Sequence, residues 1–284
     1  MSTHNLDERT VRSFGAEWAH FDQSPLAHEA KTGHRFNEYF GIFPWNALPD
    51  NAVGADVGCG SGRWAALVAP RVGHLHCLDA SDDALNVARR NLTRAGNCTF
   101  HHASVDVMPI PADSLDFCYS LGVLHHIPDT SAGIRSCVQL LKPGAPFLLY
   151  LYYALDGRPI WFRAIWRGTD FVRRIIARLP LNAKRHVTDL IALCVYLPLA
   201  RFAALVEYFV GNPANLPLSW YRDKTFYTMR TNALDRFGTP IEHRFSRAQI
   251  EAMLCDAGLE HIRFSDAPPF WCVVSRRKKA KSVD

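Results

Sequence analysis

Residues 55–62 read Ala-Asp-Val-Gly-Cys-Gly-Ser-Gly, and they stand between an apolar run and a segment with helical spacing. This order predicts a strand, a glycine turn and the start of a helix. Glycine allows backbone angles that other residues avoid and lets a ligand approach the main chain closely. A helix start offers unpaired N–H groups and the positive end of a dipole. Because Asp56 adds a carboxylate, the turn suits a zwitterionic nucleoside cofactor better than a bare phosphate.

Strands and helices alternate on both sides of this turn. We expect strands over 52–57, 74–79, 98–103, 115–121 and 147–153. Such alternation predicts a parallel sheet covered by helices on both faces. The pattern returns near residue 241, where Ser246 and Gln249 form a capping box that starts a helix. Two strands, 261–265 and 270–275, follow with too short a connection for a crossover helix, so this last pair is expected to be antiparallel.

The chain therefore divides into three parts. Residues 1–50 are expected to form a helical N-terminal lead-in, and residues 51–153 with 241–275 form the sheet domain. Residues 154–240 interrupt the alternation, are rich in aromatic residues, leucine and arginine, and are expected to form a helical cap insertion. The predicted fold is α/β, a doubly wound Rossmann-like seven-stranded sheet that is mostly parallel and has an antiparallel last strand.

Composition excludes several classes of function. The net charge is +5, and five basic residues crowd into the last ten positions, so the body is close to neutral and a nucleic-acid partner is not expected. The eight cysteines form no C-x-x-C pair, so no metal site is expected. Residues 1–12 are polar and lack a signal-peptide core, and the apolar run 190–200 is shorter than the roughly 20 residues of a membrane span. These features predict a cytoplasmic protein.

Four features are expected at the carboxyl ends of the predicted strands, where doubly wound sheets bind ligands. The glycine turn follows the first strand. Asp79 ends the second strand and is placed to accept hydrogen bonds from a ribose diol. Residues 104–106 follow the third strand, and residues 120–122 follow the fourth. All four should line one crevice.

The glycine spacing separates two classes of cofactor site. A dinucleotide site requires G-x-G-x-x-G, whereas here Gly58, Gly60 and Gly62 alternate and Arg63 stands where the third glycine belongs. Three further features accompany this spacing, namely Asp79, the step Leu124-His125-His126 and the turn Pro143-Gly144. Together they resemble the class I S-adenosylmethionine-dependent methyltransferases, and the resemblance covers 51–153 and 241–275.

The resemblance implies roles for individual residues. Asp56 and the backbone of 58–62 would surround the methionine moiety, Asp79 would bind both ribose hydroxyls, and Ala80 would lie against adenine. The family's acidic adenine contact corresponds here to Ser104, so either Ser104 or the nearby Asp106 takes that role. The residues implied to bind the cofactor are Asp56, Gly58, Cys59, Gly60, Gly62, Asp79, Ala80, Ser104, Val105 and Leu121.

The histidine step offers a candidate for catalysis. A neutral imidazole can remove a proton near neutral pH, so His126 is the candidate general base, and packing is the alternative interpretation for His125 and His126. Methyl transfer from an activated sulfonium needs alignment of the acceptor above all, with the reacting atoms about 3–3.5 Å apart. A base is needed only where the acceptor must lose a proton.

The sequence of the insertion gives an indication of the kind of methyl acceptor. A helix over 160–179 would place Arg163, Arg167, Arg174 and Arg178 opposite an apolar face. This pattern fits a cap over the sheet's carboxyl edge, or contact with a lipophilic acceptor or an inner membrane face through residues 155–211.

Aromatic residues later in the insertion could form the wall of an acceptor site, so Tyr221 and Tyr227 are candidate substrate contacts. The expected activity is methyl transfer to a small, apolar or aromatic acceptor. The alternatives are a nucleotide-dependent oxidoreductase or epimerase and a non-catalytic, membrane-docked scaffold that binds the cofactor.

Overall fold

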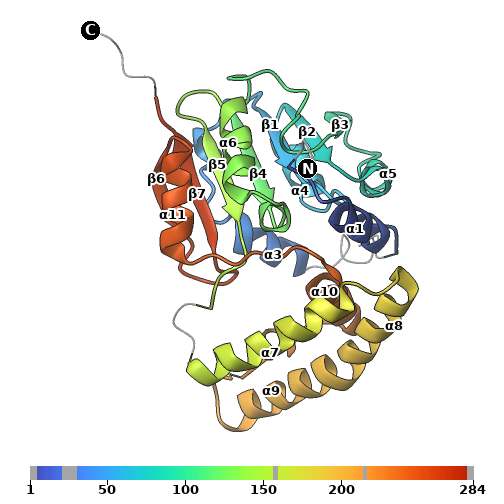
Figure 1. Cartoon of the computed structure of the whole chain (residues 1–284). Coiled ribbons are helices and arrows are strands. Elements are labelled where there is room, and N and C mark those ends of the chain that lie inside the picture. The colour runs from blue at the N-terminus through green and yellow to red at the C-terminus, as the bar shows by residue number, and fades with distance from the viewer. Residues whose placement is uncertain (1–4, 21–30, 156–158, 214–215, 280–284) are drawn as a thin grey trace. The chain divides into compact units, whose positions relative to one another are not determined.

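Seven strands form one sheet in the computed structural model, which describes residues 5–20, 31–155, 159–213 and 216–279 (Figure 1). They are β1 (Val53–Val57), β2 (His74–Asp79), β3 (Cys98–His102), β4 (Phe117–Leu121), β5 (Pro146–Tyr150), β6 (Leu259–Phe264) and β7 (Cys272–Arg277). Their order in the sheet is β3-β2-β1-β4-β5-β7-β6, and β7 runs antiparallel to both neighbours. This confirms the predicted fold class.

Strand β1 lies at the point where the strand order reverses. Ala55 pairs with His76 of β2 on one side and with Cys118 of β4 on the other, and both pairings are parallel. The connections that leave β1 and β4 therefore diverge at the carboxyl edge of the sheet. This divergence creates the crevice in which such folds bind ligands.

Helices cover both faces of the sheet because each face presents buried apolar residues. One face packs against α6 (Thr130–Leu140) and α11 (Arg247–Asp256), which contribute Ile134, Val138, Ile250 and Leu254 to the core. The other face packs against α3 (Lys31–Phe40), α4 (Ala65–Val68) and α5 (Asp82–Asn91). The predicted caps are present, since Ser81 accepts from the Ala84 amide and Ser246 and Gln249 form the capping box.

Several strand ends differ from the sequence-based expectation by one or two residues, and two element boundaries differ by three. The helix after the glycine turn begins at Ala65 rather than at Gly62, because Gly62 has φ of +75°, outside the helical region. This helix has only four residues, so its dipole contributes little to the crevice. Strand β5 ends at Tyr150 rather than at Tyr153, because its antiparallel partner β7 begins at Cys272, opposite Tyr150.

The chain divides into two units, residues 1–156 with 241–284 and residues 157–240. The second unit is helical, with α7 (Ile160–Ile176), α8 (Leu181–Ile191), a π turn (Ala192–Tyr196), α9 (Leu197–Phe209) and α10 (Phe226–Gly238). Its core contains Ile176, Tyr196, Met229, Ala233 and Phe237. Gly168 lies within α7 without interrupting it, and the π turn ends two residues before Pro198.

Candidate active site

The glycine turn adopts the backbone conformation that its composition predicts. Gly58, Gly60 and Gly62 have φ of +80°, +54° and +75°. A Cβ atom on Gly58 would lie 2.4 Å from Cγ2 of Val123, a residue that follows β4. The turn is therefore packed closely against the segment after the neighbouring strand, and only glycine fits at residue 58.

Replacing Gly58 with alanine is expected to lower the free energy of unfolding by at least about 1–2 kcal/mol, because a left-handed backbone and a clash are both imposed. Gly96→Ala is the matched control, since no atom lies within 4 Å of its Cβ position and its φ is not in the left-handed region. Chemical denaturation of both variants checks the difference. Equal stability of the two variants would contradict the packing described for Gly58.

Asp79 joins the glycine turn to the start of α5. Its Oδ2 accepts a hydrogen bond from the Gly60 amide at 2.9 Å, and its Oδ1 accepts one from the Ser81 amide at 2.9 Å. Burial raises the pKa of Asp79, while these two amides favour the charged form. Each carboxylate oxygen retains a second lone pair, so the residue can still accept hydrogen bonds from a ribose diol.

The amides of the turn are already hydrogen bonded within the domain. Those of Gly58 and Cys59 donate to the Leu78 carbonyl at 2.8 and 2.9 Å, and that of Gly60 donates to Asp79. The turn thus offers a surface without side chains, rather than a row of unpaired donors. Cys59 is 5% exposed; a hydrogen bond with Cys77 lowers its pKa, but burial and the carboxyl groups of Asp79 and Asp56 outweigh this and raise it to about 11. Cys59 is therefore a packed thiol.

Asp56 is buried, 2% exposed, and accepts a hydrogen bond from the Tyr119 hydroxyl at 2.9 Å. Burial, with a smaller contribution from the charge of Asp79, raises the pKa of Asp56 to about 8, although the Tyr119 hydrogen bond opposes the shift. A cation beside this carboxyl would favour its ionised form. The residue therefore fits a cofactor that carries a sulfonium and an ammonium group.

The raised pKa of Asp56 has a consequence for stability. The folded chain retains this proton up to about pH 8, whereas the unfolded chain loses it near 3.8, so the contribution of Asp56 to stability falls as pH rises between these values. Asp56→Asn cannot ionise, so its free energy of unfolding relative to wild type should rise by at least about 1 kcal/mol between pH 5 and pH 8. Urea denaturation at both pH values measures this change, and a pH-independent difference would show that Asp56 is ionised in the folded chain.

The remaining predicted cofactor residues lie along the same edge. The Ser104 hydroxyl donates to Oδ1 of Asp106 at 2.6 Å, and Oδ2 of Asp106 accepts from the Asn5 amide at 3.1 Å. The Ala80 carbonyl lies 3.0 Å from Nε2 of His102. Val105 and Leu121 are buried in the two apolar cores on either face of the sheet. Ser104 and Asp106 are thus hydrogen bonded to each other. A change at either residue would therefore also affect the adenine contact predicted for the other.

Helix α1 (Glu8–His20) lies against the turn, which sequence analysis did not predict. A Cβ atom on Gly60 would lie 3.1 Å from Nε1 of Trp18, and one on Gly15 would lie 2.3 Å from the Ser81 hydroxyl. The Phe14 ring lies 4.9 Å from the His126 ring. The helix therefore touches the turn after β1, the start of α5 and the histidine step. The spacing of Phe14 and Trp18 indicated an apolar face but not its partner.

The histidine step forms a short 3₁₀ turn (Leu124–His126) after β4. Nδ1 of His126 lies 2.7 Å from the Ile241 carbonyl, which can only accept, so the ring proton is on Nδ1 and Nε2 carries the lone pair. Burial lowers the pKa of His125 far below its usual range, and its ring lies between those of His126 and Tyr152, at 4.0 and 3.9 Å. Among the described residues, neither ring nitrogen of His125 has a hydrogen-bond partner.

The predicted substrate residues Tyr221 and Tyr227 belong to the helical unit. The Tyr221 hydroxyl accepts a hydrogen bond from Nδ2 of Asn232 at 3.1 Å, and its ring packs 5.0 Å from that of Tyr196. Tyr227 lies in the first turn of α10, and its carbonyl accepts from the Thr231 hydroxyl. Their contact with an acceptor stays a prediction.

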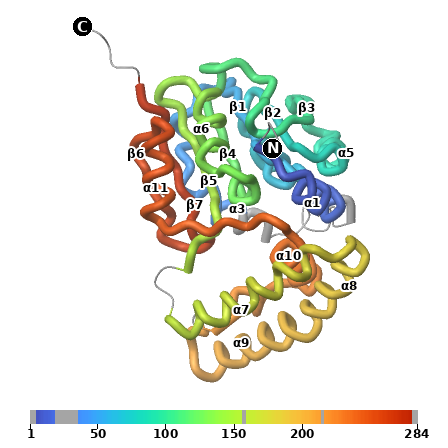
Figure 2. The backbone as a smooth tube through the Cα atoms, viewed as in Figure 1, coloured from blue at the N-terminus to red at the C-terminus, as the bar shows by residue number. Residues whose placement is uncertain are grey.

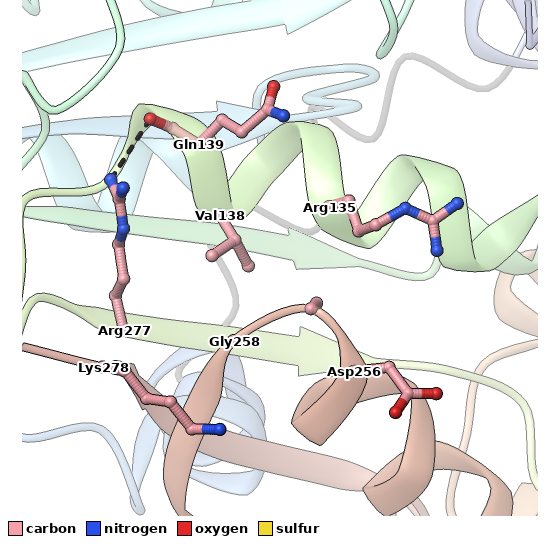
Figure 3. A pocket seen from close by; sticks show the side chains of 8 residues that line it. Arg135, Val138, Gln139, Asp256, Gly258, Arg277 and Lys278 are labelled. Atoms are coloured by element: carbon pink, nitrogen blue, oxygen red, sulfur yellow. Dashed lines mark hydrogen bonds between the residues drawn. The ribbon is translucent and has the colours of Figure 1, made fainter. Parts of the chain in front are cut away.

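A cavity of about 340 Å³ lies away from this crevice (Figure 3). It is bounded by the end of α6, the end of α11 and the end of β7, where Arg277 donates to the Gln139 carbonyl at 3.3 Å. Because β7 is antiparallel to β5, and Arg276 pairs with Pro146 at the start of β5, this cavity lies at the amino edge of the parallel strands. It takes no part in the site described above.

Comparison with known proteins shows which family this chain resembles. A model of the methyltransferase domain matches residues 55–149. A ubiquinone biosynthesis O-methyltransferase of Aromatoleum aromaticum is 30% identical over 166 residues, which cover 53% of this chain and 70% of that protein. One from Hahella chejuensis is 27% identical over 180 residues, covering 60% of this chain and 75% of the relative.

Solved structures show the same fold. A candidate methyltransferase in complex with a Haloferax volcanii methyltransferase activator aligns over 95% of this chain and 98% of its own, with a TM-score of 0.55 and 16% identity. A S-adenosylmethionine-dependent methyltransferase of Methanosarcina mazei aligns over 84% of this chain and 99% of its own, with a TM-score of 0.50 and 16% identity.

The strand order is that of a doubly wound α/β fold, in which ligands bind at the carboxyl edge of the sheet. The chain belongs to the class I S-adenosylmethionine-dependent methyltransferases, and S-adenosylmethionine is its cofactor. The enzyme class predicted from the sequence is therefore confirmed, against the oxidoreductase and the non-catalytic alternatives.

Proposed function

We propose that this methyltransferase acts on a small, apolar or aromatic acceptor. The observation that carries the proposal is a cluster of rings at the carboxyl ends of β4 and β5. The His125 ring lies 3.9 Å from that of Tyr152 and 6.5 Å from that of Tyr150, and the Phe14 ring packs on His126. Flat side chains beside a few polar groups are typical of pockets that hold small apolar molecules.

The relatives support oxygen as the atom that receives the methyl group. Both reported relatives are named as O-methyltransferases of ubiquinone biosynthesis. A hydroxyl acceptor has a proton to lose, which gives the neutral His126 a role. The proposed acceptor is therefore an aromatic or apolar molecule whose hydroxyl group receives the methyl group.

The bound cofactor would supply a methyl group that is already activated by its positive sulfur. Asp79 and the glycine turn would hold the adenosyl part, and the buried Asp56 would favour the cationic part. The hydroxyl proton of the acceptor would pass to Nε2 of His126 as the new oxygen–carbon bond forms and the sulfur–carbon bond breaks. S-adenosylhomocysteine and the methyl ether would be the products.

A labelled cofactor tests this function. The enzyme is incubated with S-adenosylmethionine labelled in its methyl group and with panels of phenols, aliphatic alcohols, polar amines, RNA and protein. We expect label in the solvent-extractable phase with phenols or other apolar alcohols. Label transferred to RNA, protein or polar amines alone would contradict the proposed acceptor class while leaving the methyltransferase assignment intact.

A further inference from the structure

The helical unit exposes an unusual number of apolar side chains. Of the nineteen large apolar side chains that are exposed among the described residues, eighteen lie between Ile160 and Phe226. The exception is Val107, in the sheet domain. Exposed apolar side chains concentrated in one unit to this extent indicate an interaction site.

Helix α7 does not bury most of its apolar face, as an amphipathic helix of a soluble protein would. Trp161, Ile165 and Val172, on the apolar face, are 48%, 51% and 44% exposed, whereas the polar residues Asp170 and Arg173 are buried. Arg173 donates to Oδ1 of Asp170 at 2.7 Å and to the Thr239 carbonyl at 2.8 Å. These polar contacts, together with Ile176 in the apolar core, hold α7 within its unit, whereas Trp161, Ile165 and Val172 point away from that core.

Helices α8 and α9 continue this surface. With the π turn they form one continuous helix, Leu181–Phe209 (Figure 2). It has 29 residues, and its most apolar 18-residue window has a mean hydropathy of 1.9 and is 22% buried. The exposed residues include Leu190, Leu193, Phe202, Leu205 and Phe209. By length and composition this helix could cross a membrane, which the shorter run 190–200 did not indicate.

The buried side of this helix argues that it lies on a membrane rather than across it. Lys184 donates to the Gly238 carbonyl at 2.7 Å, and Arg230 of α10 forms two hydrogen bonds of 2.8 Å with Asp189. Tyr196 and Ala200 pack in the core of the same unit. Crossing a bilayer would place these charged groups in hydrocarbon or break their contacts, whereas an in-plane position leaves them intact.

The net charge of the helical unit indicates the charge of the surface to which it would bind. Residues 157–240 contain thirteen lysines and arginines against five aspartates and glutamates, a net charge of +8, whereas the rest of the chain carries −3. The exposed basic residues include Arg163, Arg167, Arg174, Arg178 and Arg201. Exposed apolar helices with basic neighbours are the pattern of interfacial membrane helices, which anionic lipids attract.

We propose that residues 157–240 dock on the surface of a bilayer that contains anionic lipids, with the exposed apolar faces of α7 and α9 in the headgroup region. Such docking would place the enzyme at the inner membrane face, where an apolar acceptor is concentrated. It is independent of the chemistry at the sheet edge, so the two proposals can fail separately.

Flotation of the full-length protein with vesicles tests the docking. We expect it to float with phosphatidylcholine vesicles that contain phosphatidylglycerol, and several-fold less with phosphatidylcholine alone or at high salt. The double variant Phe202→Asp/Leu205→Asp should reduce the floating fraction at least fivefold. Val107→Asp is the matched control, because it changes an exposed apolar residue outside the helical unit, and it should float as wild type does.

Binding of S-adenosylhomocysteine by each variant, measured calorimetrically, shows that the sheet domain is folded. Circular dichroism and thermal unfolding of the double variant show that the helical unit is intact. No flotation of the wild type with anionic vesicles, or unchanged flotation of the folded double variant, would overturn the proposal. A lipid-free dimer that the double variant dissociates, seen by analytical ultracentrifugation, would also overturn it and would assign the surface to a second copy of the chain.

Discussion

Replacing His126 with alanine is expected to lower kcat about 100-fold or more with a hydroxyl acceptor, and to leave the Kd for S-adenosylmethionine within about threefold. The ring holds its proton on Nδ1 through the Ile241 carbonyl, so Nε2 is the site that can take a proton. Loss of that site removes the group that receives the proton, whereas the cofactor contacts at the glycine turn and Asp79 remain. Steady-state kinetics and calorimetric titration separate the two quantities.

The neighbouring His243 provides the control for this prediction. It is an exposed histidine whose backbone amide donates to the His125 carbonyl at 2.8 Å, and its ring, 6.2 Å from that of Phe245, takes no part in the proposed reaction. His243→Ala should therefore retain kcat. Turnover of His126→Ala within threefold of wild type, in a variant that unfolds at the same temperature, would mean that His126 only packs.

Replacing Asp79 with alanine is expected to weaken cofactor binding by about 1.5–3 kcal/mol, or roughly 10- to 150-fold in Kd. The variant loses the charged acceptor for the ribose hydroxyls. It also leaves the amides of Gly60 and Ser81 without the carboxylate that orders the turn and the start of α5. Both losses act on the same site, so the effect should exceed that of removing one neutral hydrogen bond.

Asp82→Ala is the matched control for Asp79. Asp82 is an exposed carboxylate in the first turn of α5 and pairs with Arg89 at 3.5 Å, so its loss should change the Kd by less than about threefold. Calorimetric titration with S-adenosylhomocysteine measures both variants at one pH and salt concentration. An unchanged Kd in Asp79→Ala would show that the ribose is held elsewhere.

Local chemistry explains why much of the sheet domain could be predicted from its sequence. Glycines at 58, 60 and 62 adopt positive φ as their composition indicates, and Ser81 and Ser246 cap the helices that they precede. These features depend on residues that are close together in the chain. The edge of the sheet that carries the cofactor site follows from strand alternation in the same way.

Features that depend on distant contacts could not be predicted. The spacing of Phe14 and Trp18 shows an apolar face, but it does not reveal that Trp18 lies against Gly60, 42 positions away, and Phe14 against His126, 112 positions away. The amides of the glycine turn were expected to face a ligand, whereas Leu78 and Asp79 accept from three of them. Such pairings are set by the tertiary structure.

The helical unit shows a second feature that the spacing of apolar residues could not predict. An amphipathic pattern identifies two faces but not which residues are buried, and in α7 Asp170 and Arg173 are buried while Trp161, Ile165 and Val172 are exposed. The nearly neutral charge of the body likewise conceals a basic helical unit beside an acidic remainder. Both features become visible only when the structure separates the two units.

A crystal structure of the protein with S-adenosylhomocysteine tests the central claim most directly. We predict ribose hydroxyls within hydrogen-bond distance of Asp79, the homocysteine part beside Asp56 and the turn from Gly58 to Gly62, and adenine near Ala80 and Ser104. Ligand bound elsewhere, or a ribose that does not touch Asp79, would contradict the account.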